Sequence, residues 1–260
     1  MHSDITTDTD IETRYTPANT LSATWLIAKR QALEAIMTRT TLIMMVFWLV
    51  FLTVMVVFIL GASTSNHSAR GQATTATEIA FLLALMGLMF SQTSIGIAAG
   101  VFAGDKERGC LLPLLATPAS NLALFAGKVL GAVLPALSYA AIGIVVYYSE
   151  IGLFFGIETL RLTPIGLSLL ILVLIVAAAF LGAGLASVIS SRVSTYQSAQ
   201  TYSSLIVTIL SVGVSILIFF VSSWGIWAFA LVIGGICVLD VLLITWAAAT
   251  WQREEVMARQ

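Results

Sequence analysis

Charged side chains are scarce in this chain of 260 residues. Asp, Glu, Lys and Arg make up 10% of it, hydrophobic residues make up 59%, and the mean hydropathy is +1.00. Soluble domains carry about 25% charged residues, so the composition excludes that class and predicts a polytopic membrane protein. The net charge of −1 provides no basic field for a nucleic-acid backbone. Nucleic acid is therefore excluded as a partner, and the lipid bilayer is expected instead.

Residues that carry catalysis or bind metals are also few. The only histidines are His2 and His67, so a histidine base or zinc site within a span is excluded. The two cysteines, Cys110 and Cys237, lie in a charged loop and in the last apolar run, where pairing is not expected.

Sequence motifs for enzymes and for ATP binding are missing as well. A phosphate-binding loop requires Ser or Thr after Gly-Lys, whereas Gly127-Lys128 is followed by Val129. The Gly-x-Ser-x-Gly elbow of serine hydrolases does not occur. We expect no active site, no metal and no cofactor bound by this chain.

Long apolar runs are the dominant feature of what is present. Each is long enough to cross a hydrocarbon core of about 30 Å at about 1.5 Å per residue. They cover approximately residues 41–60, 79–103, 126–148, 165–189, 200–221 and 226–251. The expected fold is all-α, with six transmembrane helices in a single domain over residues 21–251. Residues 62–78 and 149–164 are expected to be outer loops, with Tyr147-Tyr148 at headgroup level.

The first 38 residues divide into two segments. Residues 1–20 are polar and lack the features of a signal peptide, so we expect a disordered cytoplasmic tail, with a second tail at 252–260. Residues 21–38 predict an amphipathic helix in the membrane interface; the alternative is a plain extension of the first span. Its apolar face would hold Trp25, Leu26, Ala28, Ala32, Leu33, Ile36 and Met37, opposite Arg30, Gln31, Glu34 and Thr38.

The distribution of Lys and Arg predicts the orientation. Ten of the twelve fall on one side of the expected spans, and only Arg70 and Arg161 fall on the other. By the positive-inside rule, both termini and the loop after the second span are cytoplasmic. The expected location is a cell membrane, crossed several times.

The densest run of charge is Asp105-Lys106-Glu107-Arg108, between the second and third spans. Each ionised side chain at the bilayer centre costs about 2.5–3.5 kcal/mol, so this run must lie outside the hydrocarbon. Gly109 and a leucine-rich turn ending at Pro118 follow it. This pattern predicts a short amphipathic helix at the membrane face, with one side available to a soluble partner.

The same residues carry a resemblance to a known family. Glu107-Arg108-Gly109, Leu111, Leu114 and Pro118, followed by Gly127-Lys128, resemble the cytoplasmic coupling loop of type-2 ATP-binding-cassette (ABC) exporter permeases. The resemblance implies a permease subunit that forms the translocation pathway and exports substrate. The residues that would couple to the ATPase are Asp105, Lys106, Glu107, Arg108, Gly109, Leu111, Leu114 and Pro118.

The resemblance also implies partners. Two copies of a separate cytoplasmic ATPase would bind ATP and Mg²⁺, and a second permease copy, identical or paralogous, would complete a dimer. Two alternatives stay open. One is the haem-export permease of cytochrome c maturation, and the other is a membrane scaffold or assembly factor without a transport cycle.

Polar side chains follow one face of two expected spans. On the fifth span they begin at Gln197 and recur at alternating steps of four and three, which places them on one helical face. Polar groups stacked through a bilayer must face protein or water. The predicted pathway residues are Gln92, Gly96, Gly100, Thr201, Ser204, Thr208, Ser211 and Ser215. Alternatively, the hydroxyls bond to their own helix and the glycines only pack.

Asp240 is the one acid within the expected spans. Its expected partner is Lys128, at the start of the third span, with Arg192 as the second choice. Two interpretations stay open. Asp240 has a structural role, in an ion pair or as a protonated carboxyl group, or it acts as a gate or cation site near the inner mouth of the pathway.

Overall fold

The computed structural model describes residues 20–63, 69–109, 121–163, 165–205, 208–209, 212–213 and 226–250. Secondary structure in these ranges is helical, and none of their residues forms a strand. Five helices there are long and apolar enough to cross a membrane: Arg39–Ala62, Thr75–Glu107, Leu122–Arg161, Ile165–Arg192 and Ala230–Ala247. The chain is therefore an all-α membrane protein.

The expected fifth span, residues 200–221, lies largely outside the described residues. Within it, residues 200–205, 208–209 and 212–213 are helical, and that helix starts at residue 196. Six spans therefore stay a prediction. The expected tails, residues 1–20 and 252–260, also lie outside the described residues apart from Thr20.

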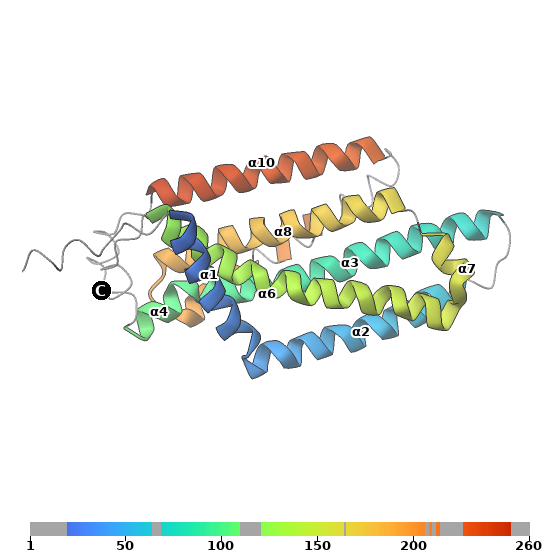
Figure 1. Cartoon of the computed structure of the whole chain (residues 1–260), viewed down its shortest axis with the longest axis horizontal. Helices are drawn as coiled ribbons and strands as arrows, with labels where there is room; N and C mark the ends of the chain where they lie inside the picture. The colour runs from blue at the N-terminus through green and yellow to red at the C-terminus, as the bar shows by residue number, and fades with distance from the viewer. Residues whose placement is uncertain are drawn as a thin grey trace, which may run out of the picture.

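The long helices lie side by side along the long axis of the molecule (Figure 1). Short elements occupy the two ends, with α1 and α4 at one end and α7 at the other. The bounds are α1 Thr20–Ile36, α2 Arg39–Ser63, α3 Ala69–Val101, α4 Ala103–Glu107, α6 Asn121–Glu150, a π-helical turn η3 Ile151–Phe155, α7 Gly156–Arg161, α8 Ile165–Arg192 and α10 Ile226–Thr250.

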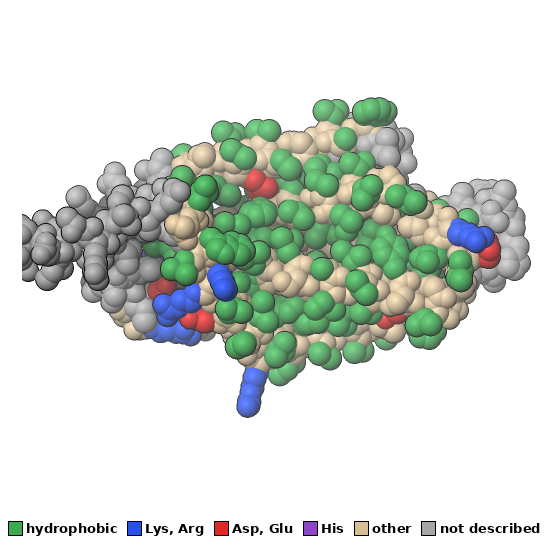
Figure 2. Space-filling model, in the orientation of Figure 1, with side chains coloured by type: hydrophobic (Ala, Val, Ile, Leu, Met, Phe, Trp, Pro, Cys, Tyr) green, Lys and Arg blue, Asp and Glu red, His purple; other side chains and the backbone are tan. Residues whose placement is uncertain are grey.

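Apolar side chains cover the middle of the face drawn in Figure 2, and charged ones gather mostly toward its ends. Helices α2 and α10 leave most of their apolar residues exposed, as in a lipid-facing helix. Inside the bundle, large side chains of α2, α3, α6 and α8 fill the half near α7. Toward α4 the core is smaller and rich in alanine.

Two expected loops are shorter than predicted. The prediction of a loop over residues 62–78 was wrong in its second half, because α3 begins at Ala69. Thr75 and Ile79 lie about one turn apart and are both buried. Tertiary packing thus extends the helix through residues of low helix propensity.

The expected outer connection at 149–164 is largely helical. Helix α6 continues to Glu150 and passes into η3 and α7, because the apolar run Ile151–Phe155 prolongs the helix. Tyr147 is buried, and its hydroxyl donates to the Ile79 carbonyl at 2.6 Å. Tyr147 therefore packs inside the bundle against α3, and its position at headgroup level stays a prediction.

Helices α3 and α8 run parallel and in contact over most of their length. A Cβ on Gly87 would lie 2.1 Å from Ile175, so only glycine permits this approach without a shift of that side chain. The Ser91 and Ser94 hydroxyls reach the carbonyls of Ile175 at 3.2 Å and Ala179 at 3.1 Å. Hydroxyls in the middle of α3 thus contact α8 directly.

Helix α1 packs across α6 through a face that differs from the prediction. Cβ atoms added at Gly127 and Gly131 would lie 3.1 Å from Ile27 Cβ and 2.8 Å from Gln31 Cβ. Gln31, assigned to the polar face, therefore lies against α6. Of the predicted apolar face, Ala28 and Ala32 are buried, whereas Trp25, Leu26, Leu33 and Met37 are exposed. The large apolar residues point away from the bundle, and a position in the membrane interface stays a prediction.

Candidate functional site at the end of α3

The charged bend forms where the second candidate span breaks. Helix α3 ends at Val101, Phe102 interrupts it, and α4 continues for five residues from Ala103 to Glu107. Gly109 has a φ of +67°, a left-handed conformation that glycine adopts without strain. Glycine here therefore ends the short helix and turns the chain, which gives the Glu-Arg-Gly sequence a physical role.

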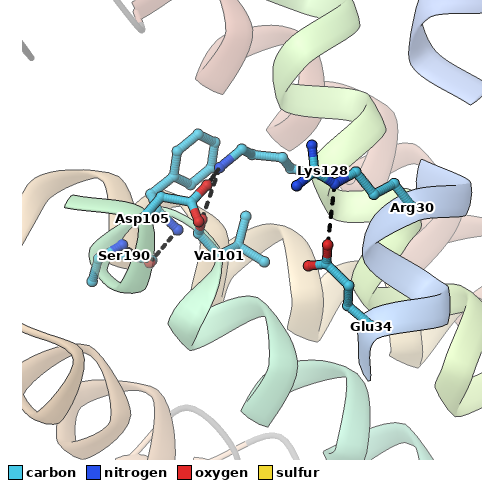
Figure 3. A network of polar contacts seen from close by, with 8 residues as sticks. Arg30, Glu34, Val101, Asp105, Lys128 and Ser190 are labelled. Atoms are coloured by element: carbon cyan, nitrogen blue, oxygen red, sulfur yellow. Dashed lines mark hydrogen bonds and ion pairs between the residues drawn. The ribbon is translucent and has the colours of Figure 1, made fainter. Parts of the chain in front are cut away.

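Lys128 of α6 joins this bend from the side (Figure 3). Its side chain is only 2% exposed, and Nζ lies 2.5 Å from Asp105 Oδ2 and 2.8 Å from the Val101 carbonyl oxygen. The ammonium also lies 4.4 Å from the centroid of the Phe102 ring. A buried cation needs such partners, because desolvation would otherwise outweigh its interactions. Lys128 therefore fixes the position of α4 relative to α6.

Ser190, near the end of α8, holds the bend from another side. Its hydroxyl oxygen accepts hydrogen bonds from the backbone N–H groups of Phe102 and Ala103, at 3.1 and 3.0 Å. These two donors lie where the helix is interrupted, so the serine ties the end of α8 to this point of the bend.

Lys106 and Glu107 extend the junction to the next helix. Lys106 Nζ donates to the carbonyls of Ser191 and Val193, at 2.8 and 3.1 Å, at the carboxyl end of α8. Glu107 Oε1 accepts the backbone N–H of Tyr196 at 2.9 Å. Tyr196 is the first residue of the helix over residues 196–205. The bend is thus bonded to three other helices.

This arrangement revises the interpretation of the charged run. The resemblance assigns Asp105 through Arg108 to coupling with an ATPase, and Asp105, Lys106 and Glu107 also make bonds within the chain. Arg108 and Gly109 are exposed. Leu111, Leu114 and Pro118, which the resemblance also assigns to coupling with the ATPase, lie outside the described residues.

The predicted pathway residues of α3 have unequal surroundings. Gln92 and Gly96 are half-buried, and a Cβ added at Gly96 would meet no atom within 4 Å. A Cβ at Gly100 would lie 2.6 Å from the Tyr196 ring. Close packing within the chain is therefore made at Gly100 and not at Gly96.

The predicted pathway residues of the fifth span face outward in this single chain. Thr201, Ser204 and Thr208 are exposed, and their hydroxyls bond to carbonyls of their own helix at 3.0, 2.7 and 3.0 Å. The exposed face agrees with a surface that meets water or a second copy, while the bonds agree with the alternative interpretation. Ser211 and Ser215 lie outside the described residues.

Asp240 lies near the middle of α10 and is 8% exposed. The expected ion pair with Lys128 is not formed, because Lys128 binds Asp105 instead. Its Oδ1 is buried and has no hydrogen-bond partner among the described residues. Arg192, the second expected partner, lies 5.7 Å from the Trp246 ring centroid. Asp240 is therefore a buried acid without the cation that the sequence assigned to it.

Several contacts at this site, and one at the other end of the bundle, were not predicted. Ser190 and the Tyr196 backbone were missed because a helix end is satisfied by residues distant in sequence. Glu150, which lies against Thr53 of α2, was assigned to an outer loop. The apolar residues 151–155 immediately after it were the signal that it sits within a long apolar segment.

No protein-family model matches this chain, and no curated protein matches it. Among the described residues, no cluster of three or more His, Cys, Asp or Glu side chains could hold a metal ion.

Proposed function

We propose that this chain is the membrane-spanning permease subunit of an ABC exporter, driven by a separate cytoplasmic ATPase. One observation carries the proposal. The charged bend after α3 is bonded through Lys128 to α6, through Ser190 and Lys106 to α8, and through Glu107 to the helix starting at residue 196. A force applied to such a bend would act on several spans together.

The bend then has two functional parts. Arg108, Gly109, Leu111, Leu114 and Pro118 form the surface that docks onto the ATPase. Asp105, Lys106 and Glu107 transmit its motion, because their side chains already bond to neighbouring helices. This division refines the assignment from the resemblance, in which all eight residues couple to the ATPase without separate roles.

The proposed cycle is alternating access in a dimer of two permease copies, each carrying one ATPase. Closure of the two ATPases on ATP moves both bends, and the spans bonded to them tilt together. The pathway would run between the polar faces of α3 and the fifth span. The exposure of Thr201, Ser204 and Thr208 supports this arrangement, since hydroxyls on a lipid-facing surface gain nothing.

Co-purification tests the proposal. The tagged full-length chain is solubilised from its native membrane, and bound proteins are assayed for ATP hydrolysis. In a background without native cysteines, Arg108→Cys carries a photoreactive thiol cross-linker, with Glu158→Cys at the opposite end as the control. We expect an ATPase cross-linked at 108 and not at 158. Absence of an ATPase, or cross-linking at 158 alone, would overturn the proposal and favour a scaffold.

A further inference from the structure

A second buried acid lies at the other end of the bundle, far from the charged bend. Glu150 is the last residue of α6, directly before η3, within the candidate span Leu122–Arg161. It is 8% exposed and contacts Thr53, which lies inside the Arg39–Ala62 span. The acid therefore sits between two spans, within an apolar cluster that includes Val56, Leu60 and Ile151.

The hydrogen-bond partners of Thr53 bear on the charge of Glu150. Thr53 Oγ1 lies 3.1 Å from the Leu49 carbonyl oxygen and also within hydrogen-bond distance of Glu150 Oε1. A threonine hydroxyl has one proton but can accept as well as donate. If the hydroxyl donates to the Leu49 carbonyl, which can only accept, the contact with Glu150 needs a proton on the carboxyl group; if it donates to Glu150 instead, the carboxyl group can be ionised.

The charge balance favours the arrangement with a protonated carboxyl group. Glu150 Oε2 is buried and has no hydrogen-bond partner among the described residues. Among the described residues, no cation forms an ion pair with Glu150. Lys128 binds Asp105 and Arg161 binds Glu158 instead. A carboxylate buried without a cation or donors costs far more than a neutral carboxyl with one unpaired carbonyl oxygen.

Other titratable groups occur on the elements around Glu150. Tyr147 and Tyr148 lie on α6 itself, and Tyr147 interacts electrostatically with Glu150. Helix α3 contributes Glu78, whose Oε2 is also buried without a partner among the described residues. Helix α7 contributes the exposed pair Glu158–Arg161, and α2 has no titratable group after Arg39. These neighbours are acidic or already paired, so they favour the neutral form of Glu150.

We propose that Glu150 is a proton-binding site: its carboxyl group is protonated at neutral pH and donates to Thr53, which in turn donates to the Leu49 carbonyl. The ligand is a proton, because Glu150 Oε2 is fully covered by the surrounding atoms. A larger ligand could not reach this oxygen without a rearrangement of the chain. Loss of the proton places a negative charge between α2 and α6 and weakens their packing. The site is independent of the proposed docking bend.

Infrared spectroscopy of the purified full-length chain in detergent tests the proposal. A protonated carboxyl group has a C=O stretching band that a carboxylate lacks. In a background with Asp240→Asn and Glu78→Gln, which removes the two other acids that have a buried oxygen without a partner among the described residues, we expect this band at neutral pH. We expect its loss in Glu150→Gln, its retention in the matched control Glu158→Gln, and a shift in its frequency in Thr53→Val. Absence of the band, or its persistence in Glu150→Gln, would overturn the proposal.

Thermal unfolding gives a second measurement. A folded state that holds one more proton than the unfolded state loses stability as pH rises. The unfolding midpoint of the parent chain should therefore fall more between about pH 6 and about pH 8 than that of Glu150→Gln. Equal slopes would contradict the proposal. Thr53→Val keeps the infrared test decisive if Glu150→Gln does not fold. Neither measurement needs an ATPase, so failure here leaves the proposed function untouched.

Discussion

Glu107 accepts a hydrogen bond from the backbone N–H of Tyr196, a residue 89 positions further along the chain. Thr195 precedes Tyr196, and its hydroxyl accepts the N–H of Ser198 at 3.2 Å, as an N-cap residue does. Glu107 thus satisfies a second free N–H of the same helix end and places a negative charge at its positive end. The charged bend and the polar face of the fifth span are joined by this one carboxylate.

The first prediction separates transmission from docking. Glu107→Ala should lower stability by about 1 kcal/mol, as loss of a helix cap does, and leave the ATPase bound. The readout is the reactivity of Thr208→Cys with a water-soluble thiol reagent, in a chain whose two native cysteines are replaced. ATP should change this reactivity in the parent complex and not in Glu107→Ala.

Arg108→Ala is the matched control for that experiment. The Arg108 side chain is exposed, so its loss should weaken ATPase binding with little effect on folding. Exchange of the two charges, Glu107→Arg with Arg108→Glu, should uncouple ATP hydrolysis from transport. If Glu107→Ala abolished ATPase binding and Arg108→Ala did not, the two roles would have to be reversed.

The second prediction concerns the unequal burial of the Lys128–Asp105 pair. The side chains are 2% and 33% exposed, respectively. Asp105→Asn leaves a buried cation without its anion and should cost about 3–5 kcal/mol. Lys128→Met leaves a carboxylate that water reaches and should cost less. The double variant should be more stable than Asp105→Asn alone. Unfolding midpoints in detergent measure all three.

An exposed ion pair provides the control. Glu158 and Arg161 lie 3.0 Å apart with side chains 86% and 71% exposed, and such pairs contribute about 0–1 kcal/mol. Glu158→Gln should therefore leave the midpoint nearly unchanged. Equal losses in Asp105→Asn and Lys128→Met would show that burial does not decide the effect.

The sequence predicted the helical class and five of the expected spans because long apolar runs have one solution in a bilayer. The ends of the helices were harder to predict from the sequence. Thr75 and Ile79 are buried by contacts with other helices, and no local pattern near Ala69 indicates those contacts.

The candidate site was predicted as a position but not as a set of contacts. Charge density singled out residues 105–108, and the glycine at 109 is needed for its positive φ. The assignment of Lys128 to Asp240 followed from depth along the spans. Depth does not determine which side chains meet. Helix α4 places Asp105 Oδ2 2.5 Å from Lys128 Nζ, so Lys128 pairs with Asp105 and not with Asp240.

The third prediction uses two glycines on one face of α3. A Cβ at Gly96 would meet no atom within 4 Å, and helical Gly→Ala changes stabilise by up to about 1 kcal/mol. The same change at Gly100 would place Cβ 2.6 Å from the Tyr196 ring and force that ring to move. Gly96→Ala should therefore raise the unfolding midpoint, whereas Gly100→Ala should lower it. A similar rise in both variants would show that Tyr196 does not pack on Gly100.

The fourth prediction asks whether Asp240 has a function beyond packing. Asn has nearly the same shape, and Oδ1 has no donor among the described residues, so Asp240→Asn should fold with an unchanged or higher unfolding midpoint. If the acid acts as a gate or cation site, the ATPase rate of the complex and the ATP-dependent reactivity at position 208 should both change. The control is Val241→Ala, next to Asp240 on an exposed part of α10. If the ATPase rate and the reactivity at position 208 are unchanged in Asp240→Asn, Asp240 has only a structural role. Asp240→Leu should then stabilise the chain further, because an apolar side chain avoids the desolvation cost of a buried carboxyl group.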